Sequence, residues 1–342
     1  MMQTDIFTQS ADKIFSLANP SSGFDAAIWS QVEEAGFDRL LLPEDDGGAG
    51  DAFEEATAIV GSMGRHAAAV PLVETLVANW CLSRAGLKVE SGSKAFVALD
   101  SSQARYEDGN VLLQKEVIFC WAPVADQVVV LVRSFDGTSK LIVLEGIGGA
   151  VGTSMASDPL TILTADVKLR PSHAVLFNDG DLALALAALL KSAAMSGAIS
   201  AALDLSIEYA NSRKQFGKPI GAFQAVQHMV VRIASEMASV DAAVRYGAGT
   251  LATEPLWAAA LAKGRASEAA GIVCAAAHQL HGAIGFTREY ALHRYSRRLW
   301  SWREEYGNER VWYRAVGEAA LADSTSLWAK MTERGLLESP AR

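Results

Sequence analysis

The spacing of hydrophobic and polar positions divides the 342-residue chain into three segments. Residues 1–92 and 179–342 place hydrophobic residues at the three- and four-residue intervals of buried helix faces. Between them, residues 93–178 contain short aliphatic and β-branched runs separated by glycine, serine and aspartate, which is typical of an antiparallel β domain. We therefore expect an α+β multidomain protein in which a β domain separates two helical domains.

The same pattern predicts individual elements. The N-terminal domain is expected to contain helices at residues 26–35 and 53–64, a turn-rich stretch at residues 43–50, and a second helix pair around residues 70–84. Strands are expected at residues 94–99, 110–114, 127–133 and 140–145. The C-terminal domain is expected to contain bundle helices at residues 182–209, 223–251 and 256–280.

Composition and charge narrow the classes of protein. A net charge of −9 argues against nucleic acid and against an anionic membrane surface as partners. The three cysteines show neither a disulfide framework nor metal-site spacing, so we expect no bound metal. The N-terminal residues are too polar for a signal peptide, and no charge-free apolar run has membrane-spanning length. We therefore expect a cytoplasmic protein without a membrane partner.

Residues 209–224, YANSRKQFGKPIGAFQ, are the first segment with candidate chemistry. A helix is expected to end near Phe216, Pro219 enforces a turn, and a new helix starts near Phe223. A helix start beside Arg213 would offer backbone N–H groups and a forked cation to a pyrophosphate. An interhelical turn with a surface arginine explains the same residues and is the more common arrangement.

The second segment, residues 279–298, is QLHGAIGFTREYALHRYSRR. Its small residues after a long helix would let the backbone approach a ligand or another chain closely. His281 by itself predicts a structural histidine, and solvated or ion-paired side chains are predicted for Arg294, Arg297 and Arg298. The glycine-rich residues 146–152 fail the spacing of a dinucleotide-binding motif and are expected to form a loop.

Together these two segments resemble the two most recognisable C-terminal segments of the acyl-CoA dehydrogenase family, in the same order and at a similar separation. Upstream, LLPEDDGGAG at residues 41–50 resembles the N-terminal domain of that family, and CWAPVADQVVVLV at residues 120–132 resembles a strand of its middle domain. The resemblance is specific in the C-terminal third of the chain and loose in residues 93–178. It implies an N-terminal helical domain, a middle β-barrel and a C-terminal four-helix bundle.

The resemblance also implies a cofactor and a reaction. Members of the family hold FAD between the β domain and the bundles, across a subunit interface. A glutamate removes a proton from the carbon α to an acyl-CoA thioester, a hydride passes from the β-carbon to the flavin, and electrons pass on to an electron-transfer flavoprotein. Matched by motif, the residues that would contact FAD from one subunit are Arg213, Gln215, Phe216 and Gln224, and those that would contact its ADP half from the neighbouring subunit are Gln279, Gly282 and Ala283.

The position of the catalytic base departs from the family. The glutamate of the family's Tyr-Glu-Gly-Thr stretch corresponds to Tyr306, which follows Glu305 here. The alternative glutamate position, on the first bundle helix, corresponds to Ala187. A phenol with a pKa near 10 is a poor base at neutral pH. Glu305 or Glu304 would replace the base if the loop shifted by one residue, although two solvated carboxylates on a surface loop are the more common arrangement.

The middle domain departs from the family as well. It lacks a Thr-Glu-Pro-Gly-like flavin loop and carries ALDSSQ at residues 98–103 instead. The chain is also short for the family, like the subunits that some bacteria pair with a longer acyl-CoA dehydrogenase subunit, notably in steroid side-chain breakdown. We therefore expect one subunit of a heteromeric enzyme for a bulky acyl-CoA. The alternatives are a self-sufficient homotetramer that uses Glu305 and a non-catalytic subunit that only stabilises its partner.

Overall fold

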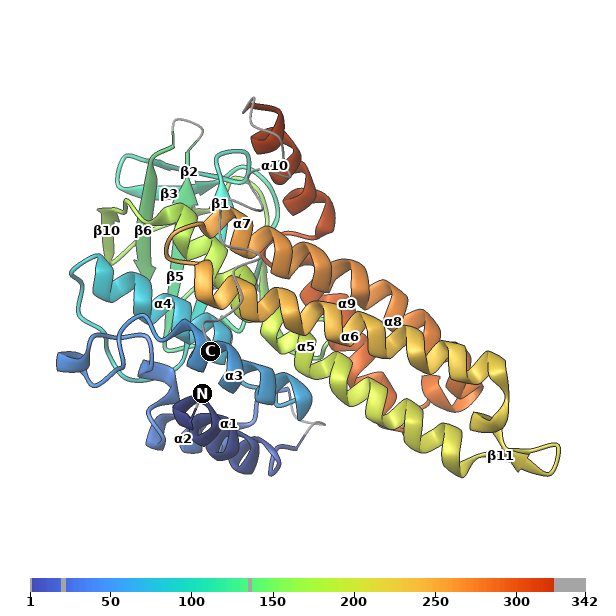
Figure 1. Cartoon of the computed structure of the whole chain (residues 1–342). Helices are drawn as coiled ribbons and strands as arrows, with labels where there is room; N and C mark the ends of the chain where they lie inside the picture. The colour runs from blue at the N-terminus through green and yellow to red at the C-terminus, as the bar shows by residue number, and fades with distance from the viewer. Residues whose placement is uncertain (1, 20–22, 135–136, 323–342) are drawn as a thin grey trace.

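The computed structural model of the chain describes residues 2–19, 23–134 and 137–322. The N-terminal helices pack against the long C-terminal helices, and the strands of the middle segment lie at one end of these helices (Figure 1). The N-terminal elements are α1 (Met2–Phe15), α2 (Ala26–Glu34), the short 3-10 helices η1 (Phe37–Arg39) and η2 (Glu44–Asp46), α3 (Phe53–Arg65) and α4 (Leu72–Arg84).

The helices predicted at residues 26–35 and 53–64 are confirmed as α2 and α3. Helix α2 begins where the carboxylate of Asp25 accepts the backbone N–H of Ile28 at 3.2 Å. The helix pair predicted around residues 70–84 is wrong, because only α4 forms there. Ala67 has a φ of 51° and interrupts the helical backbone, and Pro71 then directly precedes the new helix.

The middle segment forms three small sheets. The first, in the order β1-β5-β6-β10, contains β1 (Lys94–Asp100), β5 (Gln127–Arg133), β6 (Ser139–Leu144) and β10 (His173–Leu176). The second, in the order β2-β3-β9, contains β2 (Ala104–Glu107), β3 (Asn110–Leu113) and β9 (Lys168–Leu169). The third, in the order β4-β8-β7, contains β4 (Val117–Cys120), β8 (Pro159–Leu163) and β7 (Ala150–Thr153).

All four predicted strands are present, as β1, β3, β5 and β6, but two expectations for this domain are wrong. The domain is not antiparallel throughout, because β1 pairs in parallel with β5, with Lys94 opposite Gln127. The chain between these two strands forms β2, β3 and β4 in the other sheets and returns to the side where β1 started. Within the described residues the strands therefore form three separate sheets, not one closed barrel.

The C-terminal segment forms a helical bundle that ends in a protruding hairpin (Figure 1). Its helices are α5 (Gly180–Ser212), α6 (Gln224–Thr250), α7 (Pro255–Ala259), α8 (Arg265–His281), α9 (Leu292–Glu304) and α10 (Glu309–Ala322). A π-helical turn, η4 (Ala260–Gly264), joins α7 to α8 without a break, and the hairpin consists of β11 (Lys214–Gln215) and β12 (Lys218–Pro219). The short helices η3 (Ile220–Ala222) and η5 (Gly282–Phe286) complete the segment.

Helix α5 is the centre of the molecule. It packs against α3, α6, α8 and α9, and most of its side chains are buried. By length and composition, the helices at residues 180–212 and 255–286 are apolar enough to cross a membrane, although 83% and 50% of their apolar windows are buried inside the protein. Core helices have the same property, so the finding is weak evidence for a membrane span. Neither helix is a charge-free run, because Lys191 lies in the first and Lys263 in the second.

The crossing of α3 and α5 depends on glycines. A Cβ atom on Gly197 would overlap the backbone carbonyl oxygen of Gly61, and one on Gly64 would overlap that of Ala194. The two helix backbones are therefore in direct contact, with no room for a side chain between them. This contact fixes the N-terminal helical layer against the bundle.

We expect Gly197→Ala to lower the free energy of unfolding by about 1–3 kcal/mol, because the new methyl group meets a backbone that cannot move away cheaply. Gly317→Ala on α10 is the matched control, since a Cβ there meets nothing within 4 Å. That control should stabilise the protein by up to about 1 kcal/mol through helix propensity. Urea unfolding measures both changes, provided that the slope of the free energy of unfolding against urea concentration is the same in each variant. Equal stabilisation by the two substitutions would contradict the backbone contact.

Candidate functional site

The loop that the sequence assigns to the catalytic base, residues 304–308, joins α9 to α10. Tyr306 and Gly307 have positive φ angles of 56° and 88°, so the backbone makes a tight turn in the left-handed region. Nε1 of Trp312 donates a hydrogen bond to the backbone carbonyl of Tyr306 at 3.0 Å and supports this turn. The Tyr306 side chain consequently reaches α4 and β1.

Tyr306 places a phenol where the family has a carboxylate. Its hydroxyl donates to the backbone carbonyl of Phe96 at 3.1 Å and to Oε1 of Glu74 at 3.4 Å. Burial, and then the carboxylates of Glu74 and Glu305, raise the pKa of Tyr306 well above its ordinary value. The second base position, Ala187, is fully buried in α5. Neither position therefore holds a group that accepts a proton at neutral pH.

Lys191 lies beside both base positions. It follows Ala187 by one helical turn on α5, and its Nζ is 2.8 Å from Oε1 of Glu74 and 2.8 Å from Oε2 of Glu305. Burial alone would lower the pKa of Lys191, but the carboxylates of Glu305 and Glu74 raise it above its ordinary value. The ammonium group therefore stays charged between two carboxylates. We call Glu74, Lys191 and Glu305 the ion triad.

The ion triad corrects the expectation for Glu305. Two solvated carboxylates are the more common arrangement in such a loop, and the Glu304 side chain is 64% exposed. The Glu305 side chain is only 17% exposed, because the ammonium of Lys191 replaces water as its partner. Its other oxygen accepts a hydrogen bond from Oγ of Ser301 at 3.3 Å. The solvated arrangement is therefore right for Glu304 and wrong for Glu305.

A second buried lysine holds the same loop by its backbone. Nζ of Lys263, in the π-helical turn η4, donates to the carbonyl oxygens of Arg303 and Gly307, each at 2.8 Å, and to Oγ of Ser267 at 3.0 Å. The two carbonyls flank residues 304–306, so this one group fixes both ends of the loop. Burial lowers the pKa of Lys263 to about 7, against the opposing effect of Glu305.

Glu74, Lys191 and Lys263 were not among the residues predicted from the sequence. One signal was present, because Lys191 is the only charged residue between Leu182 and Leu203. A lone charge on a buried helix requires a partner. The partner itself was not visible, because Glu74 lies 117 residues earlier in the chain.

The prediction for the arginines of α9 also needs correction. Arg298 is 3% exposed, and its Nη1 donates to the backbone carbonyl of Arg294 at 3.2 Å. Nη2 of Arg297 donates to Oγ of Ser157 at 2.9 Å. Arg297 is thus part of the contact between α9 and the β domain. Arg298 is buried near the charge of Asp158, so of the two roles predicted for it, solvated or ion-paired, the solvated one is wrong.

The first group of residues assigned to FAD lies around the hairpin at the end of α5. Arg213 follows the last residue of α5, Gln215 and Phe216 lie in the hairpin, and Gln224 begins α6. Phe216 has a φ of 51° and is 90% exposed, and its ring meets the edge of the Phe223 ring with 6.0 Å between centroids. The hairpin thus presents an aromatic ring beside an exposed cation.

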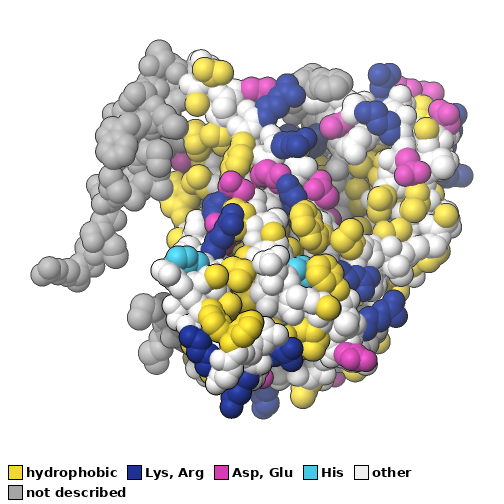
Figure 2. All heavy atoms as spheres, turned by 90° about the vertical axis from the view of Figure 1, so that its right-hand side faces the viewer, with side chains coloured by type: hydrophobic (Ala, Val, Ile, Leu, Met, Phe, Trp, Pro, Cys, Tyr) yellow, Lys and Arg dark blue, Asp and Glu magenta, His cyan; other side chains and the backbone are white. Residues whose placement is uncertain are grey.

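The second group lies at the end of α8. Gln279, Gly282 and Ala283 are exposed, and Gly282 ends the helix with φ 63° and ψ −143°, a conformation that glycine adopts readily. The buried ring of His281 stacks on Tyr209 of α5 with 4.7 Å between centroids. This stacking brings the two groups to the same end of the bundle, which faces the viewer in Figure 2. His281 is a structural histidine, as the sequence predicted.

This end of the bundle fits a flavin dinucleotide. The exposed guanidinium of Arg213 forms no ion pair with any described residue, so its donors are available to a pyrophosphate. Phe216 at 90% and Phe286 at 70% exposure offer aromatic faces for a ring system. Lys and Arg side chains lie among hydrophobic ones on this face (Figure 2). The residues carried over by motif therefore combine the cationic and aromatic chemistry that such a cofactor needs.

The region of the missing flavin loop is a tight turn between β1 and β2. The backbone N–H of Asp100 donates to Oε1 of Gln103 at 3.1 Å, and Oδ1 of Asp100 accepts the N–H of Ser102 at 2.7 Å. The turn is closed by its own polar groups. This agrees with the absence of a Thr-Glu-Pro-Gly-like segment from the sequence.

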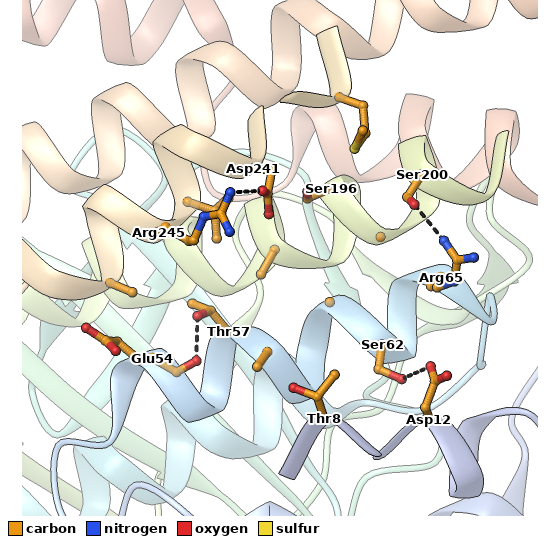
Figure 3. Close-up of a pocket in the computed structure, with 17 residues that line it drawn as sticks. Thr8, Asp12, Glu54, Thr57, Ser62, Arg65, Ser196, Ser200, Asp241 and Arg245 are labelled. Carbon is orange, nitrogen blue, oxygen red and sulfur yellow. Dashed lines mark hydrogen bonds and ion pairs between the residues drawn. The ribbon is translucent and has the colours of Figure 1, made fainter. Parts of the chain in front are cut away.

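Two cavities among the described residues lie elsewhere in the fold. One, of about 600 Å³, lies between α1, α3, α5 and α6; Ser196 and Ser200 lie along one side of it, and Arg65 and Arg245 lie on the helices that flank it (Figure 3). The other, of about 670 Å³, lies between α2, η1 and the start of β1. Neither is lined by Tyr306 or by a residue of the ion triad.

Comparison with known proteins is consistent with this geometry. A family model described as "Acyl-CoA dehydrogenase, C-terminal domain" matches residues 182–321. The chain is 31% identical over 325 residues to acyl-CoA dehydrogenase IpdE2 of Mycobacterium tuberculosis, an alignment that covers 93% of this chain and 89% of the relative.

Solved structures share the fold. The ChsE4-ChsE5 complex from Mycobacterium tuberculosis matches with a TM-score of 0.77 and 21% identity, over 95% of this chain and 99% of that one. A variant of the Tcur3481-Tcur3483 steroid ACAD matches with a TM-score of 0.76 and 23% identity, over 94% of this chain and 99% of that one. The predicted enzyme class and its cofactor, FAD, are confirmed at the level of the family. By its sequence over nearly its whole length, and by its fold, the chain belongs to the acyl-CoA dehydrogenase family.

Proposed function

We propose that this chain is one subunit of a heteromeric acyl-CoA dehydrogenase and that it contributes FAD-binding surface without a catalytic base. The observation that carries the proposal is the half-buried Tyr306 at the base position, whose hydroxyl is 3.1 Å from the Phe96 carbonyl oxygen. Of the two possible substitutes, Glu304 is 64% exposed and Glu305 is bound to the ammonium of Lys191 at 2.8 Å. This contact occupies one of the two carboxylate oxygens of Glu305.

The exposed face of α6 is the surface on which we propose that a partner chain packs. Of its 27 residues, only Ile233, Val240, Val244, Gly247 and Ala248 are buried. Small side chains such as Ala238, Ser239 and Ala242 lie among the exposed positions, which lets another helix approach closely. The ChsE4-ChsE5 structure is itself a complex of two named chains. A longer acyl-CoA dehydrogenase subunit is therefore the partner that we propose.

Within this assembly, FAD would supply the hydride acceptor. Arg213 would hold the pyrophosphate, and Phe216 would cover an aromatic part of the cofactor in the adjacent subunit. Gln279, Gly282 and Ala283 would meet the ADP half. The proposed substrate is a bulky acyl-CoA of the steroid side-chain type, in line with the steroid ACAD among the similar structures. An electron-transfer flavoprotein is the proposed acceptor, and the cytoplasm the proposed location.

Co-expression with a longer acyl-CoA dehydrogenase subunit tests the assembly. We expect the complex to bind FAD and to oxidise a steroid side-chain CoA ester, and the chain alone to show no acyl-CoA-dependent reduction of flavin. The measurements are the ratio of flavin to protein and the bleaching of flavin absorbance on addition of substrate. A lone chain that holds stoichiometric FAD and reduces it with an acyl-CoA would favour the self-sufficient homotetramer. A complex in which no flavin contacts this chain would favour a purely structural subunit.

Glu305→Gln in the purified complex tests the base. If this chain supplies no base, the turnover number per bound flavin should change by less than about twofold. Loss of a positioned base would lower it by about 10² to 10⁴-fold. Glu304→Gln, which removes an exposed carboxylate from the same loop, is the matched control. Because turnover is counted per bound flavin, partial unfolding from the weakened ion triad does not mimic a catalytic loss.

Arg213→Ala tests the FAD surface. Charge-assisted hydrogen bonds contribute about 1.5–3 kcal/mol each, so FAD should bind at least tenfold more weakly. Because the cofactor would bridge subunits, the complex should also dissociate at higher protein concentration. Visible absorbance measures bound flavin, and sedimentation measures assembly. Arg105→Ala, which removes an exposed arginine from the β domain, is the control; equal flavin occupancy in both variants would leave Arg213 as an ordinary surface residue.

A further inference from the structure

The cavity between α2, η1 and the start of β1 is acidic and partly aromatic. Phe24 and Trp29 line it on one side, and Glu33, Asp38 and Asp126 contribute three carboxylates. Its volume of about 670 Å³ is within the range of small-molecule sites. Neither Tyr306, a residue of the ion triad nor a residue assigned to FAD lines this cavity, so neither function already described accounts for it.

Asp38 is the unusual residue of this cavity. Asp38 is only 4% exposed, and its Oδ1 has no hydrogen-bond partner among the described residues. The nearby amide of Asn79 does not supply one, because it donates to the backbone carbonyl of Asp38 at 2.9 Å. Leaving a buried carboxylate oxygen without a donor costs free energy. A donor that enters the cavity from outside would remove that cost.

The charges around Asp38 do not balance. Arg39 is the one cation among the residues that line the cavity, and its Nη2 donates to the carbonyl of Asp46 at 3.1 Å. Behind the wall, Nζ of Lys94 donates to the carbonyl oxygens of Glu90 and Gly92 at 2.7 and 3.2 Å. Three carboxylates and two cations leave one unbalanced negative charge. Burial, and then the carboxylate of Glu33, raise the pKa of Asp38 to about 6, so this charge is present at neutral pH.

The residues that line the cavity favour an organic cation over a metal ion. Among the described residues no three His, Cys, Asp or Glu side chains are grouped so as to hold a metal ion. The indole of Trp29 and the ring of Phe24, which itself packs edge-on against Trp121 at 6.5 Å, favour a carbon-bearing cation over a hydrated inorganic one. Such a ligand would place its charged head at Asp38 and its apolar stem against the rings.

We propose that this cavity binds a small organic monocation, with a primary ammonium or guanidinium group that donates to Oδ1 of Asp38 and an aliphatic stem that lies against Phe24 and Trp29. The site is independent of FAD and of the acyl-CoA reaction. Its place between α2 and β1 sets it at the contact between the N-terminal helices and the β domain.

Calorimetric titration of the full chain at pH 8 and low salt tests the site, with n-pentylammonium and n-pentylguanidinium as probes and 1-pentanol as the neutral control. We expect saturable binding of at least one of the two cations, at least tenfold tighter than that of the alcohol. Asp38→Asn should weaken it by at least tenfold, because the charge-assisted bond is lost. Glu54→Gln, which removes an equal charge from the other cavity, should leave binding unchanged.

Glu33→Gln, on the half-buried surface of α2, is a second variant, and it leaves the buried carboxylate of Asp38 unchanged. It should weaken cation binding by about two- to threefold, because one nearby negative charge is lost. Equal binding of 1-pentanol would mean that the cavity is only apolar, and the proposal would be wrong. Absence of cation binding, or unchanged binding in both Asp38→Asn and Glu33→Gln, would also overturn it. In that case an ordered water would be the partner of Asp38.

Discussion

The ammonium group of Lys191 connects three parts of the protein that are distant in sequence. It joins α5, in which it lies, to Glu74 on α4 and to Glu305 after α9. Moving charges out of water is costly, and it is tolerated only when each buried charge has a well-placed partner. Loss of Lys191 would leave two carboxylates there without a cation, whereas loss of either glutamate would leave a neutral pair. The relative positions of the N-terminal helices, the bundle and the α9–α10 loop therefore depend on one ion triad.

That triad also decides what the loop does. A general base must gain and lose a proton during turnover, which requires a pKa near the working pH. The surroundings of Lys191 and Tyr306 act in the opposite direction, because the first is held charged and the second is held neutral. Together with the hydrogen bonds from Lys263, these contacts keep the loop in one position. Such an arrangement suits a scaffold for a neighbouring site better than a site of its own.

Much of the fold could be predicted from the sequence, because helical periodicity and the two C-terminal segments are local signals. The bundle helices and the four expected strands depend on neighbours in the chain, although α5 ends at Ser212, before the expected end near Phe216. Sheet pairing depends on distant residues, so the parallel contact of β1 with β5 and the division into three sheets were not predictable. The same limit applies to Glu305. Its solvated appearance in the sequence came from local polarity, whereas its burial results from a lysine supplied by another helix.

The π-helical turn η4 determines how the long helix from Pro255 to His281 presents its two halves. A π-turn is an α-helix with one residue inserted, and each residue of an α-helix turns the chain by about 100°. The segment before the turn is therefore rotated about the helix axis relative to the segment after it. This rotation lets Ala258 and Ala259 face the core while Lys263 reaches α9. Removing a single residue from Ala260–Gly264 would restore an ordinary helix and rotate one half against the other. Either the alanines would leave the core or the lysine would lose both carbonyls, so the length of this helix is constrained to the residue.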